Sequence, residues 1–281
     1  MRGGWWSTMG LGLAVGLAAG NVGAEEPQPE PAKATLAEET DGDVVRKVRK
    51  LIQATIAADD AERVKGWQGL KEMGNLAVPA LIALYRKPGL TPAMLESVLI
   101  ALGDSKDPRA GPALLELLAF KDAQVKVGAA RALGDSGYKE ALPALETLAA
   151  NAEEDEDVRL HAATAGARMG SEKAITALQQ LAVSPNAATR SRAIFTLGKH
   201  GGAAQLAAIR KGLEDTDRGV REDTVQALTE IGEPALDALI AALNDSDYRV
   251  RASVMDGLRH VTKQRFDKPD EWRDWCAKRS K

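Results

Sequence analysis

The residue types that carry most protein chemistry are scarce in this chain of 281 residues. It has three histidines, His161, His200 and His260, and one cysteine, Cys276. One cysteine rules out an intramolecular disulfide and a cysteine-based zinc cluster. The sequence has no glycine-rich phosphate loop, nucleophile elbow or Ser/His/Asp arrangement. We therefore expect solvated or locally hydrogen-bonded histidines, no catalytic, cofactor-binding or metal-binding residues, and no enzymatic activity.

Acidic clusters are the remaining candidates, because carboxylate oxygens are ligands that Ca²⁺ prefers. They are the run Glu153–Asp157 and the pairs Asp215/Asp217 and Asp245/Asp247. None of them has the Asp-x-Asp-x-Asp-Gly loop of a calcium site, and acids are favoured at helix N-termini. We expect them to cap helices. Cys276 follows Trp275, and we expect a buried small apolar group there, with an intermolecular disulfide as the alternative.

One helical pattern recurs seven times along the chain. Its anchor positions are separated by 32, 31, 33, 31, 31 and 30 residues and are Leu70, Leu102, Leu133, Gly166, Leu197, Leu228 and Leu258. Mostly apolar or small residues stand eight, four and one positions before each anchor, which places them on one face of a helix. Only 4% of the residues are aromatic and alanine is abundant, which argues against a large β-sandwich or barrel.

A second helix is predicted after each anchor. Glycine stands four residues after most anchors, where it can end a helix in the left-handed conformation; these are Gly74, Gly137, Gly170, Gly201 and Gly232. An apolar segment follows, often with proline near its start, as in Val78-Pro-Ala-Leu. One such helical pair cannot bury its apolar face alone, so the pattern predicts stacked pairs that share a continuous core.

Two polar series accompany the repeat. Eleven residues before the anchors, Asp122, Asp155, Asn186, Asp217 and Asp247 suit helix N-caps. Seven residues before the anchors, and so four after these N-caps, come the basic residues Lys126, Arg159, Arg190, Arg221 and Arg251. Because both series repeat every ~31 residues, we expect acids and bases of adjacent units to form ion pairs along the stack.

The succession Asp-x-x-Val-Arg, Ala, Leu-Gly-x-x-Gly and Pro-Ala-Leu resembles HEAT repeats, specifically the short type of phycobiliprotein-lyase-like proteins. Residues 217–236 are the clearest copy, and the resemblance extends over about residues 60–262. It implies an all-α solenoid, a right-handed superhelix of about seven helix-turn-helix units with terminal caps. It also implies a scaffold or binding module, because most members have such roles.

Activities known within the family are not expected here. Its metal-dependent hydroxylase uses His-Glu pairs, whereas Ala162, Gly201 and Val261 follow the three histidines. The glycosylase relatives need a basic groove with aromatic residues, and a net charge of −3 argues against nucleic-acid binding. Bilin chemistry is not expected either, because the repeats contain no cysteine for a thioether bond.

The N-terminal 43 residues differ from the repeats. Residues 1–24 have an early Arg2, a glycine-rich apolar stretch and the small residues Val22-Gly-Ala24, which predict a signal peptide cleaved after Ala24. Periplasmic location or secretion follows, and the alternative is an uncleaved membrane anchor. Residues 25–43 carry seven acids, three prolines and one lysine, which predict a disordered linker of net charge −6.

The repeat region, residues 44–263, is expected to have capped ends. Residues 44–56 form an amphipathic helix with a basic face, interpreted as a cap or alternatively as a helix that binds a membrane surface or an anionic partner. Residues 264–281 are expected to form a capping helix that occupies the missing second-helix position of the seventh unit. There Trp272 and Trp275 would cover the core; an exposed hook for a partner is the alternative.

These features predict a non-catalytic exported scaffold. We expect a monomer that binds a protein partner through the concave face of the solenoid, with the second helices lining that face. The alternative is a membrane-associated adaptor or ligand sensor held by an uncleaved N-terminus.

Overall fold

The computed structural model describes residues 42–279, and all regular structure in that part of the chain is helical. The fold is an all-α solenoid. The predicted signal peptide, residues 1–24, and the linker up to residue 41 lie outside the described residues. Among residues 42–279, no helix is both long enough and apolar enough to cross a membrane.

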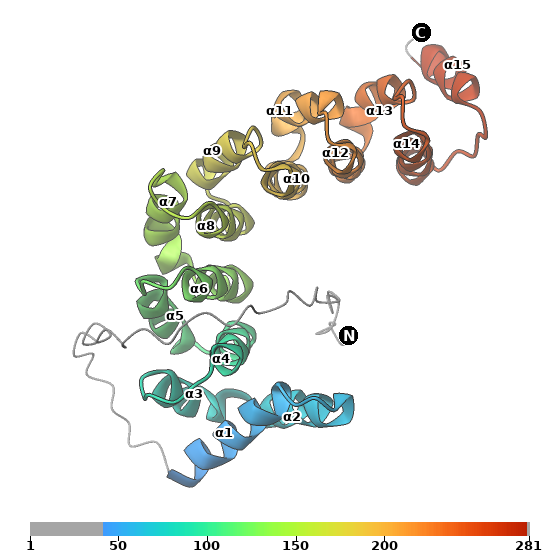
Figure 1. The fold of residues 1–281 in the computed structure, drawn as a ribbon. Coiled ribbons are helices and arrows are strands. Elements are labelled where there is room, and N and C mark those ends of the chain that lie inside the picture. The colour runs from blue at the N-terminus through green and yellow to red at the C-terminus, as the bar shows by residue number, and fades with distance from the viewer. Residues whose placement is uncertain (1–41, 280–281) are drawn as a thin grey trace. The chain divides into compact units, whose positions relative to one another are not determined.

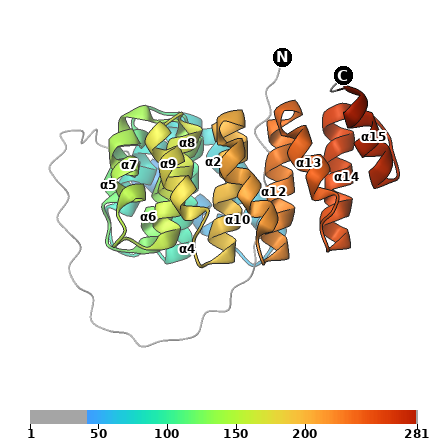
Figure 2. The same cartoon turned by 90° about the horizontal axis from the view of Figure 1, so that it is seen from above.

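The helices after the N-terminal α1 (Gly42–Thr55) alternate between two rows (Figures 1 and 2). The first helices of the repeats are α2 (Asp60–Met73), α4 (Pro92–Asp104), α6 (Ala123–Ser136), α8 (Glu156–Arg168), α10 (Ala187–Thr196), α12 (Arg218–Ile231) and α14 (Tyr248–Thr262). The second helices are α3 (Val78–Tyr85), α5 (Ala110–Leu118), α7 (Leu142–Ala150), α9 (Glu172–Leu181), α11 (Leu206–Arg210) and α13 (Leu236–Ala242), and α15 (Pro269–Arg279) ends the array.

Short turns of 3₁₀-helix connect several of these helices. They are η1 (Gly74–Leu76), η2 (Lys139–Ala141), η4 (Gly202–Gln205), η5 (Lys211–Glu214) and η6 (Glu233–Ala235). In the fifth repeat, α10 continues as one π-helical turn, η3 (Leu197–Gly201). This turn accommodates an extra residue, so the positive φ falls on Gly202 (φ 60°) and not on Gly201, where the sequence predicts the left-handed helix end.

The predicted caps hold the helix starts in place. The side chain of each predicted N-cap accepts a hydrogen bond from a backbone N–H of the first turn of α6, α8, α10, α12 or α14, and Asp59 does the same for α2. At the other ends, Gly137 (φ 70°) and Gly232 (φ 80°) take the positive φ values that the sequence predicts. Lys106 and Lys263 have positive φ values in the repeats without such a glycine.

Successive first helices pack very closely, because small residues face one another. A side chain at Gly103 would begin 2.9 Å from the backbone of Ala132, and one at Gly134 would begin 3.0 Å from Ala165. Gly198 approaches Ala227 in the same way. Each of these glycines follows its anchor, and each alanine precedes the next anchor. Without these glycines the first helices would have to move apart.

This close approach decides which row lies on the inside of the curve. From α4 to α14, consecutive first helices contact one another extensively, whereas consecutive second helices touch little or not at all. Figure 1 accordingly shows α6, α8, α10 and α12 on the inner side, with α7, α9 and α11 outside. The prediction that second helices line the concave face is therefore wrong, because the more closely spaced row must be the inner one.

The core runs along the solenoid between the two rows. Five leucine anchors, Leu102, Leu133, Leu197, Leu228 and Leu258, have no exposed surface, and Leu70 is 6% exposed. Second-helix leucines such as Leu114, Leu145 and Leu178 complete the core.

Helix α1 adds its own apolar stripe to one end of this core. Val48 and Ile52 are fully buried against the first repeats, and the Arg49 guanidinium donates to the Gly89 carbonyl at 2.9 Å. A helix bound to a membrane surface would need this stripe exposed, so the arrangement favours the cap.

Helix α15 lies beside α13, at the other end of the array. Trp272 is fully buried, and its ring meets Phe266 edge-on with centroids 4.9 Å apart. Arg273, early in α15, donates to Asn244 just past the end of α13 at 2.7 Å, while Cys276, later in α15, contacts Asp237 near the start of α13. This pairing order makes α15 antiparallel to α13, whereas a repeat's second helix would run parallel to it.

Candidate functional site

The inner row carries a set of equivalent positions that are mostly exposed or half-buried. On each first helix from α4 to α14 they lie nine, five and two residues before the anchor and two after it, and among them Ser97 and Gly128 are buried. These positions fall at i, i+4, i+7 and i+11, on one helix face. We call this set the inner stripe. By helix, its members are Ala93, Ser97, Ile100, Asp104; Gln124, Gly128, Arg131, Asp135; Asp157, His161, Thr164, Arg168; Ala188, Arg192, Phe195, Lys199; Gly219, Asp223, Gln226, Glu230; and Arg249, Ser253, Asp256, His260.

His161 occupies the middle of the inner stripe. Its Nδ1 lies 2.7 Å from the Asp157 carbonyl oxygen, one turn earlier on α8. Burial lowers the pKa of this half-buried imidazole, and the charges of Arg192 on α10 and Arg131 on α6 lower it further, against opposing effects of Asp157. Cationic groups of the two neighbouring first helices, α6 and α10, therefore act on His161.

The next helix carries two exposed cations of the inner stripe, Arg192 and Lys199. On α10 and its π-helical extension, Arg192, Phe195 and Lys199 lie on one face, with the Lys199 ammonium 5.9 Å from the centre of the half-buried Phe195 ring. Among the described residues, neither Arg192 nor Lys199 has an ion-pair partner, whereas Arg131 pairs with Glu96 at 3.4 Å and Arg168 with Asp135 at 2.5 Å. Burial, Lys199 and Arg168 also lower the pKa of His200.

The charge changes sign at the following helix. Asp223 and Glu230 of α12 occupy the same repeat positions as Arg192 and Lys199 of α10. Asp223 accepts a hydrogen bond from the Ser191 hydroxyl, which fixes its carboxylate near α10. The inner stripe thus carries two unpaired cations beside two carboxylates on neighbouring helices.

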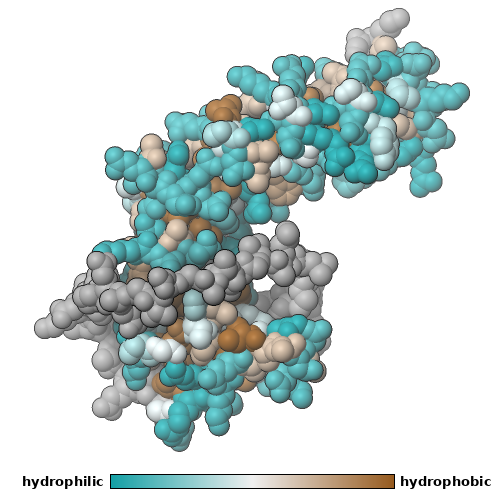
Figure 3. All heavy atoms as spheres, viewed as in Figure 1, coloured by the Kyte–Doolittle hydropathy of each residue, from teal (hydrophilic) through white to brown (hydrophobic). Residues whose placement is uncertain are grey.

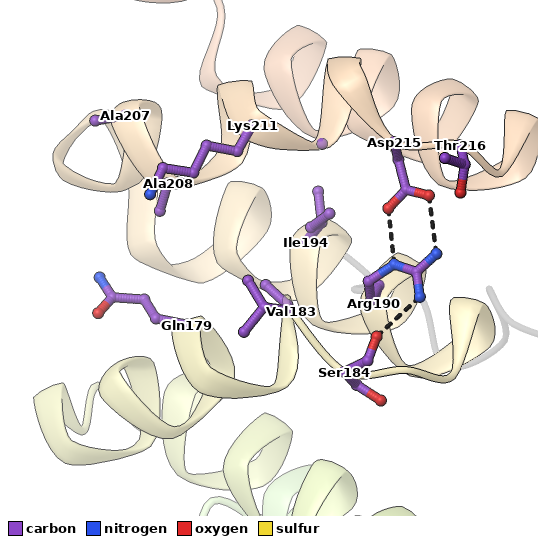
Figure 4. A pocket seen from close by; sticks show the side chains of 12 residues that line it. Gln179, Val183, Ser184, Arg190, Ile194, Ala207, Ala208, Lys211, Asp215 and Thr216 are labelled. Carbon is purple, nitrogen blue, oxygen red and sulfur yellow. Dashed lines mark hydrogen bonds and ion pairs between the residues drawn. The ribbon is translucent and has the colours of Figure 1, made fainter.

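A groove opens on the other side of the solenoid, between α9 and the α11–η5 segment (Figure 4). It has a volume of about 710 Å³, and small residues such as Ala207, Ala208 and Gly212 leave room for it. Val183 on its rim is 75% exposed. On the face of the molecule that Figure 3 shows, the surface is mostly hydrophilic, and apolar residues form small separate patches.

At one end of the groove, a guanidinium joins two consecutive repeats. Arg190 donates through Nε and Nη2 to the two carboxylate oxygens of Asp215 at 2.7 and 2.8 Å, and through Nη1 to the Ser184 carbonyl at 2.8 Å (Figure 4). Arg221 binds Asp245 in the same way, at 2.8 and 3.3 Å. The hydrogen bonds from Arg190 hold the pKa of Asp215 below its usual range.

The acids therefore have structural roles. Asp217 and Asp247 cap helices as predicted, but the arginines pair with Asp215 and Asp245, two residues before those caps, so the expected cap–base pairing is wrong. In the run at 153–157, Glu154 pairs with Lys126 at 2.5 Å and Asp155 caps α8. Within the described part of the chain, no group of three or more His, Cys, Asp or Glu residues could hold a metal.

The structure disperses the residues that the sequence marks as reactive. His161 lies on the inner stripe, His200 in the π-helical turn and His260 near the end of α14. Cys276 is half-buried, 3.9 Å from Asp237. The cluster of Arg192, Phe195 and Lys199 did not stand out in the sequence, because the repeat pattern identifies the buried face. Comparing the residues at the inner-stripe positions of each repeat would have indicated this cluster in the sequence.

Sequence comparison agrees with this architecture. Residues 120–188 and 177–259 match HEAT repeats, and residues 95–120 match the PBS lyase HEAT-like repeat. The chain belongs to the HEAT-repeat family. No curated protein matches its sequence.

This HEAT-repeat protein also resembles solved structures. One shows Kap95p with RanGDP, at 13% identity and a TM-score of 0.57, covering 78% of this chain and 34% of that chain. Another is the CpcE and CpcF complex of phycocyanin lyase from Nostoc, at 20% identity and a TM-score of 0.46, covering 89% and 95%. Human deoxyhypusine hydroxylase has 19% identity and a TM-score of 0.35, covering 79% and 98%. At such low identity, the Kap95p likeness shows the fold alone.

Proposed function

We propose that this HEAT-repeat protein is a non-catalytic scaffold that binds a protein partner on its inner face. The observation that carries the proposal is the exposed cluster of Arg192, Phe195 and Lys199, whose charges have no ion-pair partner among the described residues. Arginine and aromatic residues are enriched where protein partners bind most strongly. The non-catalytic role rests on the separation of the three histidines along the array.

Export is part of the proposal and rests on the sequence pattern of residues 1–24. A signal peptide cleaved after Ala24 would deliver the scaffold to the periplasm or the medium. The alternative is a membrane-associated adaptor or ligand sensor held by an uncleaved N-terminus. An intact Met1 in the membrane fraction would favour that alternative.

Charge reversal on each face provides the test. The inner-face variant is Arg192→Glu with Lys199→Glu, and the matched control is Arg210→Glu with Lys211→Glu, since all four side chains are exposed. In the control pair, Lys211 lines the groove between α9 and the α11–η5 segment, here called the outer groove. Tagged proteins are purified from the native cells, and co-purifying proteins are quantified. We expect the inner-face variant to lose specific partners that the control retains. Loss in the control alone would place binding in the outer groove and refute the proposal.

A further inference from the structure

We propose that the inner stripe recognises an extended segment of a partner protein that carries two carboxylates and then a basic group, at intervals of about three residues. The inference deepens the proposed function, because it names the chemistry of the partner at the same surface. It rests on the order of charges along α8, α10 and α12.

The first carboxylate position lies over α8. There, the Nδ1 of His161 is held by the Asp157 carbonyl, and the charges of Arg131 and Arg192 on the two neighbouring helices act on the imidazole. The hydrogen bond of Nδ1 to the Asp157 carbonyl fixes the ring and leaves Nε2 as the nitrogen that can donate to a ligand once the imidazole is protonated. A carboxylate is the complementary group, because hydrogen bonds between ionised partners are the strongest that side chains form.

The second carboxylate position lies over α10, where Arg192 and Lys199 flank the Phe195 ring. The Phe195 ring offers an apolar surface on which the aliphatic part of an acidic side chain, or the adjacent residue of the partner segment, can pack. Both cations lack an ion-pair partner among the described residues, so neither charge is already neutralised by a carboxylate of that part of the chain.

The basic position lies over α12, where Asp223 and Glu230 present carboxylates at the corresponding repeat positions. A purely acidic segment would be repelled there, which distinguishes this surface from a general anion site. Packed helices lie about 8–10 Å apart. A segment in the extended polyproline II conformation rises about 3.1 Å per residue with about three residues per turn, so residues three apart lie on the same side and at about this spacing.

Protonation of His161 couples binding to pH. The charged groups acting on it are Arg131 of α6, Arg192 of α10 and Asp157 of α8 itself, and burial together with the two arginines holds its pKa below the usual value. A bound carboxylate favours the imidazolium, so the pKa of His161 is higher in the complex than in the free protein. Binding then takes up a proton, and affinity rises as the pH falls through the pKa of the complex toward the lower pKa of the free protein.

The experiment measures three labelled peptides against the full-length chain by fluorescence anisotropy. The first has Glu, Glu and Lys at three-residue intervals in a Gly/Ser background; the second has Lys, Lys and Glu; the third has Gln at all three positions. We expect the first peptide to bind at least ten-fold more tightly than the others. Arg192→Ser with Lys199→Ser should weaken its binding at least ten-fold, whereas Arg210→Ser with Lys211→Ser should not.

The His161 signal gives an independent readout by NMR. We expect its pKa to rise when the first peptide binds, and we expect His161→Gln to remove the pH dependence of affinity. Equal affinity for the three peptides, or no binding at millimolar concentration, would overturn the inference. If partner proteins still co-purify through the inner face in that case, the proposed function stands and only the partner's charge pattern is wrong.

Discussion

The arginine that links the sixth and seventh repeats should stabilise the protein more than its equivalent in the last repeat. Arg221 binds the Asp245 carboxylate through two nitrogens, and its Nη1 donates to the Asp215 carbonyl at 2.9 Å. Arg251 makes only the second kind of contact, to the Asp245 and Ser246 carbonyls at 2.7 and 2.8 Å. It has no carboxylate partner in the described part of the chain, because reversed α15 replaces the segment that would supply one. Arg251→Ala is thus a matched control for Arg221→Ala.

The structure gives a magnitude for each substitution. Arg221→Ala leaves the Asp245 carboxylate, with a side chain only 9% exposed, without its cation. Removing one partner of a buried pair costs about 3–5 kcal/mol, and the retained Asp247 N–H hydrogen bond places this case near ~3 kcal/mol. Arg251→Ala removes charge-assisted hydrogen bonds to carbonyls, which costs about 1.5 kcal/mol.

Urea unfolding of the two variants measures the difference in the free energy of unfolding. We expect Arg221→Ala to be less stable than Arg251→Ala by about 1.5 kcal/mol. Equal losses would show that the bidentate ion pair adds nothing beyond the carbonyl contacts, and would refute the reasoning. Asp245→Asn should recover part of the stability of Arg221→Ala, since it removes the unpaired charge.

Four further outcomes are expected. Leu228→Ala, at a fully buried anchor, should lower the free energy of unfolding by about 2–5 kcal/mol in denaturant titrations; a silent substitution would contradict the repeat register. Truncation after Gln264 removes the buried Trp272 and should lower the Tm and the solubility, whereas an unchanged Tm with lost partner binding would favour a hook. N-terminal sequencing of the mature protein should begin at Glu25, and an intact Met1 would contradict cleavage. The pKa of Asp215 is lowered in the folded protein, so its contribution is full above the unfolded pKa and is lost as the pH falls through the folded one; acid titration should destabilise Asp215→Asn less than the unchanged protein.

Repetition made much of the fold predictable. A single Asp or Leu says little about structure, but leucine at six of the seven anchors and Asp or Asn at all five caps fix the helix starts and the buried faces. The N-cap side chains of α6, α8, α10, α12 and α14 accept the expected backbone hydrogen bonds for this reason.

Features that break or lie between the repeats were not predictable in the same way. The π-helical turn at Leu197–Gly201 moves the glycine position by one residue, and periodicity does not specify such an insertion. The direction of α15 depends on how far the segment after Lys263 runs back along α14, where the Arg259 guanidinium holds the Phe266 carbonyl at 3.1 Å. Which row of helices lies on the inside of the curve depends on contacts such as that between Gly103 and Ala132. These contacts join different repeats, and the pattern within one repeat does not specify them.

The candidate site was less predictable than the fold, because exposed residues obey no periodic rule. Arg192 and Lys199 resemble ordinary surface charges in the sequence. They form part of a candidate site only because α6 and α8 place Arg131 and His161 on the same face, and because Arg192 and Lys199 have no ion-pair partner among the described residues.

Photo-crosslinking from one repeat tests whether the inner face binds the partner. Thr164 of α8 lies on the inner stripe, and Thr176 of α9 is exposed on the outer row, so a photoreactive amino acid at each threonine gives a matched pair. After irradiation of living cells, the inner-face interaction predicts a discrete protein adduct from position 164 and none from position 176. An adduct from position 176 with none from position 164 would contradict it.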